Sequence, residues 1–234
     1  MIDFKEIEVG YNKTLFRVSE LKIKKGEIFV LAGKNGIGKS TLLKTISGQI
    51  KPLKGKLIIN EKSINTYNLK NMSQTCAIVN SSFSGIPYLT AKNYVSLGRT
   101  PHTNAWGKLN EKDEQTAINC LKDISMLSFQ DTFTNELSDG ERQLLSIARA
   151  VCQDTPIILL DEPTAFLDYK NKQKIIQYLK SIAKLKNKTI LISSHDLDIC
   201  TQEKLPFLVI SKKEKTLKKM ENADLKTILN EAFN

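Results

Sequence analysis

The chain has 234 residues, of which 41% are hydrophobic, 26% charged and 7% aromatic, and its formal net charge is +10. This length allows one large domain, or a core domain with a smaller inserted lobe, and the composition excludes disordered, fibrous and membrane-spanning proteins. The N-terminal residues contain neither a basic leader nor an apolar signal segment, so we expect a cytosolic protein. The four cysteines form no C-x-x-C pair, which predicts free thiols.

The positive charge raises the possibility of a nucleic-acid partner, because basic domains bind phosphate backbones. Residues 169–220 hold 13 lysines against four acidic residues, without arginine and without the interleaved aromatic side chains that stack on bases. We interpret these lysines as a solvated face and expect no nucleic-acid partner. A basic surface near the anionic cytoplasmic leaflet of a membrane is the alternative.

The first 23 residues alternate apolar and polar side chains, which predicts antiparallel strands. Residues 27–32 are almost continuously apolar, as expected of a strand that is buried on both faces of a parallel sheet. The next segment, Gly33–Ser40, matches the pattern G-x-x-x-x-G-K-[ST] and precedes a helical run that ends at Gly48. This strand–loop–helix order is the setting of a phosphate-binding loop, or P-loop.

Glycines in such a loop let successive backbone amides turn toward phosphates, and the following helix directs its positive end at them. Lys39 is predicted to neutralise the β- and γ-phosphates, and the Ser40 hydroxyl to ligate Mg²⁺. A glycine-rich loop alone is often only a turn, but the lysine, the serine and the setting favour a nucleotide site. The residues predicted to bind nucleotide here are Gly33, Lys34, Asn35, Gly36, Ile37, Gly38, Lys39, Ser40 and Thr41.

The middle of the chain changes from strands to helices. Short strand-like segments at 56–59 and 76–79 precede a stretch of about 90–150 that has helical spacing. Asn110 with Asp113 three residues later predicts a helix cap. The apolar residues that continue this helical spacing are Ala117, Leu121, Ile124 and Leu127.

From Pro156 onward the chain returns to strand (157–160), helix (169–185) and strand (189–193). We therefore expect a core of about residues 1–85 and 151–234, interrupted by a helical insertion of about 86–150.

The strand at 157–160 ends in two carboxylates, at the edge where open parallel sheets bind ligands. Asp161 is predicted to hold Mg²⁺ through water, as in a Walker B motif. Glu162 is placed to accept a proton from the water that attacks the γ-phosphate. An acidic turn at a strand end is the plain alternative, and the P-loop makes that alternative weaker.

The segment from Leu137 to Gln143 reads LSDGERQ and resembles the LSGGQ signature of ATP-binding cassette (ABC) ATPases, from which Asp139 and Glu141 depart. A helix that begins after Gly140 would present its N–H groups and the Ser138 hydroxyl to an anion. Seen alone, the segment also fits a capped surface helix.

Other elements of this family follow in the expected order. The resemblance places Tyr11 under the adenine ring, makes Ala165–Asp168 a D-loop that touches the partner's site, and makes His195 the switch histidine. One element is missing, because the family's magnesium-contacting glutamine is replaced by Asn80 or Ser81. No role is assigned to the other histidine, His102.

The resemblance implies an α/β fold: a P-loop core with a mostly parallel sheet, an N-terminal antiparallel β-subdomain and an inserted helical subdomain. It implies ATP and Mg²⁺ as cofactors, and Glu162, His195 and Lys39 as catalytic residues. It further implies a head-to-tail dimer, in which Ser138, Asp139, Gly140, Glu141 and Asp168 of one copy complete the partner's site. Transmembrane permease subunits and a substrate-binding protein are the other implied partners, with the chain on the cytoplasmic face of the membrane.

Residues 95–101 and 106–109 resemble the ATPases of iron-siderophore, haem and cobalamin importers, although helix packing would also account for them. An importer ATPase is therefore our expectation. The ATPase of an ABC exporter, a soluble ABC ATPase of iron–sulfur cluster assembly and a subunit that binds ATP but hydrolyses it poorly are the alternatives.

Overall fold

The computed structural model describes residues 1–103 and 107–233. The strands are β1 (Ile2–Gly10), β2 (Thr14–Ile23), β3 (Ile28–Ala32), β4 (Lys54–Ile59), β5 (Lys62–Ser63), β6 (Cys76–Val79), β7 (Ile157–Asp161), β8 (Thr189–Ser193), β9 (Phe207–Ile210) and β10 (Leu217–Met220). The α-helices are α1 (Lys39–Ile46), α2 (Leu69–Thr75), α3 (Ala91–Ser96), α4 (Glu111–Asp123), α5 (Asp139–Cys152), α6 (Tyr169–Leu185), α7 (Leu197–Gln202) and α8 (Leu225–Phe233). Short 3₁₀ helices are η1 (Ile64–Thr66), η2 (Leu97–His102) and η3 (Leu127–Phe129).

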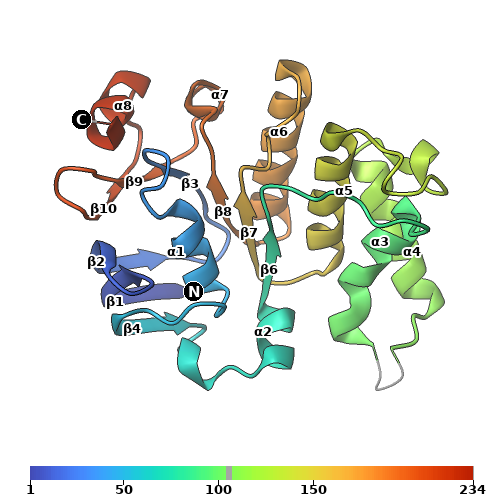
Figure 1. Ribbon diagram of the computed structural model, residues 1–234, viewed down its shortest axis with the longest axis horizontal. Coiled ribbons are helices and arrows are strands. Elements are labelled where there is room, and N and C mark those ends of the chain that lie inside the picture. The colour runs from blue at the N-terminus through green and yellow to red at the C-terminus, as the bar shows by residue number, and fades with distance from the viewer. Residues whose placement is uncertain (104–106, 234) are drawn as a thin grey trace.

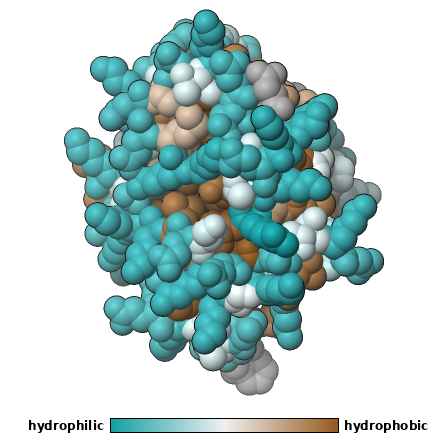
Figure 2. Space-filling model, turned by 90° about the vertical axis from the view of Figure 1, so that its left-hand side faces the viewer, coloured by the Kyte–Doolittle hydropathy of each residue, from teal (hydrophilic) through white to brown (hydrophobic). Residues whose placement is uncertain are grey.

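The N-terminal strands form an antiparallel sheet with the order β2-β1-β4-β5. In the register of β1 and β2, Phe4 lies opposite Leu21 and Ile7 lies opposite Val18. Phe4, Ile7 and Val18 are buried. Phe4 and Ile7 are three residues apart, and both can be buried because the register of β1 with β4 shifts between Lys5 and Glu8, where Glu6 has a left-handed φ of 49°. Figure 2 looks onto the side of the molecule that carries this sheet and β10; hydrophilic residues cover most of it, with hydrophobic residues visible near its centre.

The second sheet has the order β10-β9-β3-β8-β7-β6 and is parallel except for the pairing of β9 with β10. Its central strands are buried on both faces and separate two apolar clusters. Phe29 and Leu191 join a cluster with α1 and the antiparallel sheet, whereas Val30 and Ile190 join a cluster with α5, α6, α7 and α8. This arrangement confirms the predicted fold class.

Helices α3, α4 and α5 come between β6 and β7 in the chain and lie together at the right of Figure 1. The predicted cap of α4 is present as a capping box between Asn110 and Asp113. The helix predicted from the apolar spacing extends beyond the observed one, because α4 ends at Asp123 and Ser125 has a left-handed φ of 61°. Ile124 and Leu127 therefore lie beyond the helix. The exact division into core and insertion stays a prediction.

Several elements had no counterpart in the sequence prediction, namely α2, β9, β10 and α8. The lysines of 169–220 lie mainly on two separate parts of the structure, α6 and the β9–β10 hairpin. Within the described ranges, no helix is both long and apolar enough to cross a membrane.

Candidate active site

The P-loop joins β3 to α1 in a backbone shape that requires glycine at two positions. Gly36 has φ 75°, and Gly38, the residue before α1, has φ 115°. A Cβ atom on Gly38 would lie 3.0 Å from a ring carbon of Phe16, so the loop also packs too closely there for a side chain. The next residue, Lys39, is 7% exposed and donates from Nζ to the Gly33 carbonyl at 2.9 Å.

The parallel strands bring the catalytic candidates to the same edge of the sheet. Asp161, the last residue of β7, is paired in register with Ser193, the last residue of β8. Glu162 follows Asp161 directly, and His195 follows Ser193 by two residues. Because β3 is the next strand along, the P-loop opens at this edge as well.

Three of the predicted catalytic side chains meet at this edge. His195 Nε2 lies 3.2 Å from Lys39 Nζ and 3.1 Å from Glu162 Oε1. A single ring nitrogen can accept a hydrogen bond from the lysine or donate one to the carboxylate, but it cannot do both in one tautomer. The two contacts of His195 therefore compete.

Burial sets the acid–base properties of this cluster. Burial raises the pKa of the Glu162 carboxyl above its ordinary value, and the nearby His195 and Lys39 partly oppose this shift. Burial likewise lowers the pKa of the Lys39 ammonium, against the attraction of Glu162 and Asp161. A carboxylate with a raised pKa is a better proton acceptor, which is what a general base requires.

A cavity of about 260 Å³ lies against this cluster. It is lined by Asn35, Gly36, Gly38, Lys39, Ser40, Thr41, Glu162 and His195. Gly33 contributes its carbonyl to Lys39, Lys34 is exposed to solvent, and the Ile37 side chain packs on an apolar cluster instead of the cavity. The predicted P-loop, base and switch residues are thus together in one site.

The signature residues do not line this cavity. Ser138 caps α5, where its hydroxyl accepts from the Glu141 amide and donates to the Glu141 carboxylate. Asp139 pairs with Arg142 at 2.6 Å, and a Cβ on Gly140 would lie 2.9 Å from the Phe166 carbonyl. The N-terminus of α5 is therefore capped and presents Ser138 and Asp139 to solvent.

Other predicted residues also lie outside the cavity. Tyr11 is 58% exposed in the turn between β1 and β2. Asp168 caps α6 by accepting from the Asn171 amide, and Asn80 and Ser81 are exposed beyond β6. None of these residues is among those that line the cavity at the P-loop.

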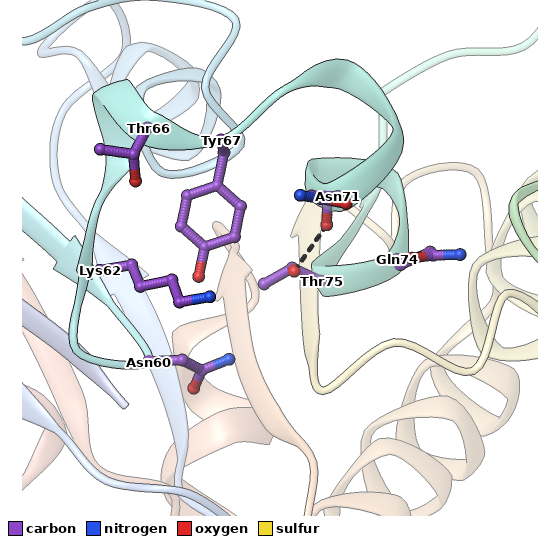
Figure 3. A pocket seen from close by; sticks show the side chains of 7 residues that line it. All are labelled: Asn60, Lys62, Thr66, Tyr67, Asn71, Gln74 and Thr75. Carbon is purple, nitrogen blue, oxygen red and sulfur yellow. Dashed lines mark hydrogen bonds between the residues drawn. The ribbon is translucent and has the colours of Figure 1, made fainter.

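A larger cavity, of about 590 Å³, lies between the β4–β5 hairpin, η1 and α2 (Figure 3). Its lining residues are Asn60, Lys62, Thr66, Tyr67, Asn71, Gln74 and Thr75. Four of these side chains already donate to backbone carbonyls: Tyr67 Oη to Ile59, Gln74 Nε2 to Pro101, Thr66 Oγ1 to Ser63 and Thr75 Oγ1 to Asn71. The lining residues include no carboxylate to act as a base, so we assign the chemistry to the smaller cavity.

Two residues near the site were not assigned a role from the sequence. Ser193 is fully buried and contacts both Asp161 and Glu162, and Gln143 Nε2 donates to the Glu162 carbonyl at 3.4 Å. A polar residue at the end of the apolar strand 189–193 was the available signal for Ser193. No sequence signal linked Gln143 to a residue 19 positions away.

The stretch that suggested an importer subfamily packs within the helical part of the chain. A Cβ on Gly98 would lie 2.4 Å from the Arg149 carbonyl, so α5 approaches η2 too closely for any other residue. Arg99 donates to Asp113 Oδ1 at 3.0 Å and to the Cys152 carbonyl at 2.9 Å. These contacts agree with the packing interpretation. Trp106, also part of the stretch, lies outside the described residues.

A P-loop between a buried strand and a helix, with a carboxylate pair on the neighbouring strand, defines a P-loop nucleotide-binding protein. The sequence profile of one family in this class, the ABC transporter family, matches residues 16–165. The chain belongs to this family, as an ATP-binding subunit.

Relatives and solved structures agree with this assignment. The chain is 34% identical to the achromobactin transport ATP-binding protein CbrD of Dickeya dadantii, over 85% of the chain and 74% of that protein. It is also 34% identical to the iron(3+)-hydroxamate import ATP-binding protein FhuC of Bacillus subtilis, over 82% and 72% respectively. A dimeric post-hydrolysis ATP-binding cassette with bound ADP and phosphate superposes with a TM-score of 0.83, at 28% identity, over 96% of this chain and 100% of that one.

Proposed function

We propose that this chain binds ATP with Mg²⁺, hydrolyses it as a pair of copies and so drives import of an iron chelate through a partner permease. The observation that carries the hydrolytic part is the contact of Glu162 with His195 beside Lys39 of the P-loop. A subunit that only bound ATP would have no need of a half-buried carboxylate with a raised pKa at this point.

Ser40 at the cavity and Asp161, the residue before Glu162 at the end of β7, are the residues that would hold a magnesium ion. The Ser40 hydroxyl lines the cavity, and Asp161 uses one carboxylate oxygen to accept a hydrogen bond from Ser193. Hydroxyl and carboxylate oxygens are the donors that this hard cation prefers. When bound, Mg²⁺ neutralises charge on the phosphate oxygens.

The competition at His195 suggests how ATP binding prepares the base. Lys39 Nζ contacts both the Gly33 carbonyl and His195 Nε2. A bound γ-phosphate would draw the Lys39 ammonium away from His195, and the His195 tautomer that carries its proton on Nε2 would then donate that proton to a hydrogen bond with Glu162. His195 then fixes the orientation of the Glu162 carboxylate, and Glu162 accepts a proton from the attacking water.

A second copy of the chain would complete the site. Ser138 and Asp139 are exposed at the N-terminus of α5, and helix N-termini favour anions. The two acidic departures from the usual signature are already engaged, Asp139 by Arg142 and Glu141 by Ser138. Arg142 therefore partly neutralises Asp139, and the Glu141 carboxylate is held back against the Ser138 amide and hydroxyl, so that the N-terminus of the helix would face a phosphate of the partner's ATP.

The transport part of the proposal rests on the relatives, whose names include achromobactin transport and iron(3+)-hydroxamate import. By this similarity the chain would sit on the cytoplasmic face of a membrane, against permease subunits supplied with substrate by a binding protein. Specificity for the chelate would then belong to those partners.

The proposal is tested by co-purifying the tagged chain, in wild-type and Glu162→Gln forms, from detergent-solubilised membranes of its native host. We expect a polytopic permease of the iron-chelate importer type, with ATPase activity that is lost in the variant. An exporter permease, or recovery of soluble partners alone, would overturn the importer function. The second result would favour an ATPase of iron–sulfur cluster assembly.

A further inference from the structure

Ser193 is the last residue of strand β8, which pairs with strand β7, and β7 ends at Asp161. Its neighbours along β8 are apolar and buried, and Ser193 itself is completely buried. In the register of the two strands it pairs with Asp161 of β7. A buried hydroxyl needs hydrogen-bond partners, so the atoms that Ser193 contacts explain its presence in this strand.

The hydroxyl of Ser193 acts as donor and acceptor at once. Ser193 Oγ donates to Asp161 Oδ1 at 2.5 Å, and it accepts from the Glu162 backbone amide at 3.0 Å. The same amide also lies 3.1 Å from the Ser193 carbonyl. One side chain therefore fixes both the carboxylate assigned to magnesium and the backbone of the assigned base.

The backbone of Glu162 needs such support. Its φ is 52°, in the left-handed region that costs free energy for a residue with a side chain. Two residues after Ser193, His195 contacts the Glu162 carboxylate at 3.1 Å. The segment 193–195 thus holds Glu162 at two points, by its backbone through Ser193 and by its carboxylate through His195.

We propose that Ser193 is a positioning residue for ATP hydrolysis, whose hydroxyl orients Asp161 toward magnesium and keeps Glu162 in the conformation that reaches the attacking water. This inference rests on the proposed hydrolytic function. Replacing a residue that hydrogen-bonds to a metal ligand, without binding the metal itself, lowers metal affinity or activity by about 10- to 100-fold. Ser193 contacts neither the P-loop nor the cavity, so it should not affect binding of the nucleotide itself.

The test compares Ser193→Thr with Ser193→Val, which have the same shape and differ in the hydroxyl. Any effect of the added methyl group in the buried strand is common to both variants. We expect Ser193→Thr to retain kcat within about threefold of wild type, and Ser193→Val to lose about 10-fold or more. KM for ATP should be unchanged in both. Equal kcat values for the two variants would overturn the proposal.

A second readout does not depend on turnover. Binding of Mn²⁺ in the presence of a non-hydrolysable ATP analogue, followed by electron paramagnetic resonance, should be about 10-fold weaker in Ser193→Val than in Ser193→Thr. Ser193→Ala, which adds no atoms, replaces the valine variant if thermal unfolding shows that Val does not fold. Equal Mn²⁺ affinity with and without the hydroxyl would contradict the positioning role. If the wild-type chain binds Mn²⁺ and nucleotide but hydrolyses no ATP, the proposed function fails while the Mn²⁺ comparison still tests Ser193.

Discussion

At the scale of single residues, the site depends on contacts between side chains that are far apart in the sequence. Lys39 and His195 are separated by 156 positions and lie 3.2 Å apart. Each residue is recognisable from its own motif, because the P-loop and the carboxylate pair have local patterns. The contacts among them come from the parallel order of β3, β8 and β7.

Replacing Glu162 with Gln keeps the shape of the side chain and removes its ability to accept a proton. We expect ATP hydrolysis to fall by about 100-fold or more, because a general base contributes on this scale. ATP affinity should change little, since the P-loop and Lys39 are untouched. Phosphate release and equilibrium binding of labelled ATP measure the two quantities, and a variant that retains most of its activity would show that Glu162 is not the base.

The raised pKa of Glu162 predicts the pH dependence of turnover. The base works only when deprotonated, so kcat should fall as the pH is lowered through this pKa, at a higher pH than the ordinary glutamate value of about 4.3. Bound phosphates add negative charge nearby and move the midpoint further up. The measurement is kcat at saturating ATP across pH, with ATP binding to Glu162→Gln as the control. A flat kcat down to about pH 4.3 would contradict the assignment.

At the scale of elements, the helical part is held together by an ion pair that the sequence did not predict. Arg99 of η2 and Asp113 of α4 have side chains that are 14% and 8% exposed. Arg99 also donates to the Cys152 carbonyl at the end of α5, so this one side chain connects three elements. The pKa of Asp113 is lowered although burial opposes the shift, because Arg99 and the backbone donate hydrogen bonds to the carboxylate.

Replacing Arg99 alone should therefore lower the free energy of unfolding more than replacing both members of the ion pair. We expect Arg99→Leu to lower the free energy of unfolding by about 3 kcal/mol, because Asp113 keeps its hydrogen bond from the Asn110 amide but is left buried without a cation. The double variant Arg99→Leu, Asp113→Asn, which keeps an oxygen that accepts from the Asn110 amide, should recover part of this loss. Urea unfolding of both variants measures the difference. If the double variant is less stable than Arg99→Leu, the unpaired carboxylate is not the cause.

Secondary structure was predicted best where an apolar pattern ran through a whole element, or where a helix cap was formed by residues close together in the sequence. The strand 189–193, the helix 169–185 and the cap of α4 are present as predicted. The end of α4 was misjudged because apolar spacing continues past Asp123, while Ser125 breaks the helix with a left-handed backbone. Ser193 was overlooked because its partners lie on another strand, and only the register of β7 with β8 identifies them.

At the scale of the whole molecule, the predicted site residues fall into two groups. The P-loop residues Asn35, Gly36 and 38–41 line the cavity with Glu162 and His195. Ser138, Asp139 and Asp168 lie at the start of helices away from that cavity. This division is expected if the second group belongs to the site of a partner copy, because a two-fold symmetric dimer would supply each group to two sites.

The most direct test of this account is the oligomeric state of Glu162→Gln with ATP and Mg²⁺, measured by sedimentation with and without the added substitution Ser138→Arg. We expect Glu162→Gln to form a dimer with ATP but not with ADP. Adding Ser138→Arg should abolish the dimer while each copy still binds ATP at its own P-loop. A Glu162→Gln chain that stays monomeric with ATP bound, or a dimer that persists with Arg at position 138, would contradict the account.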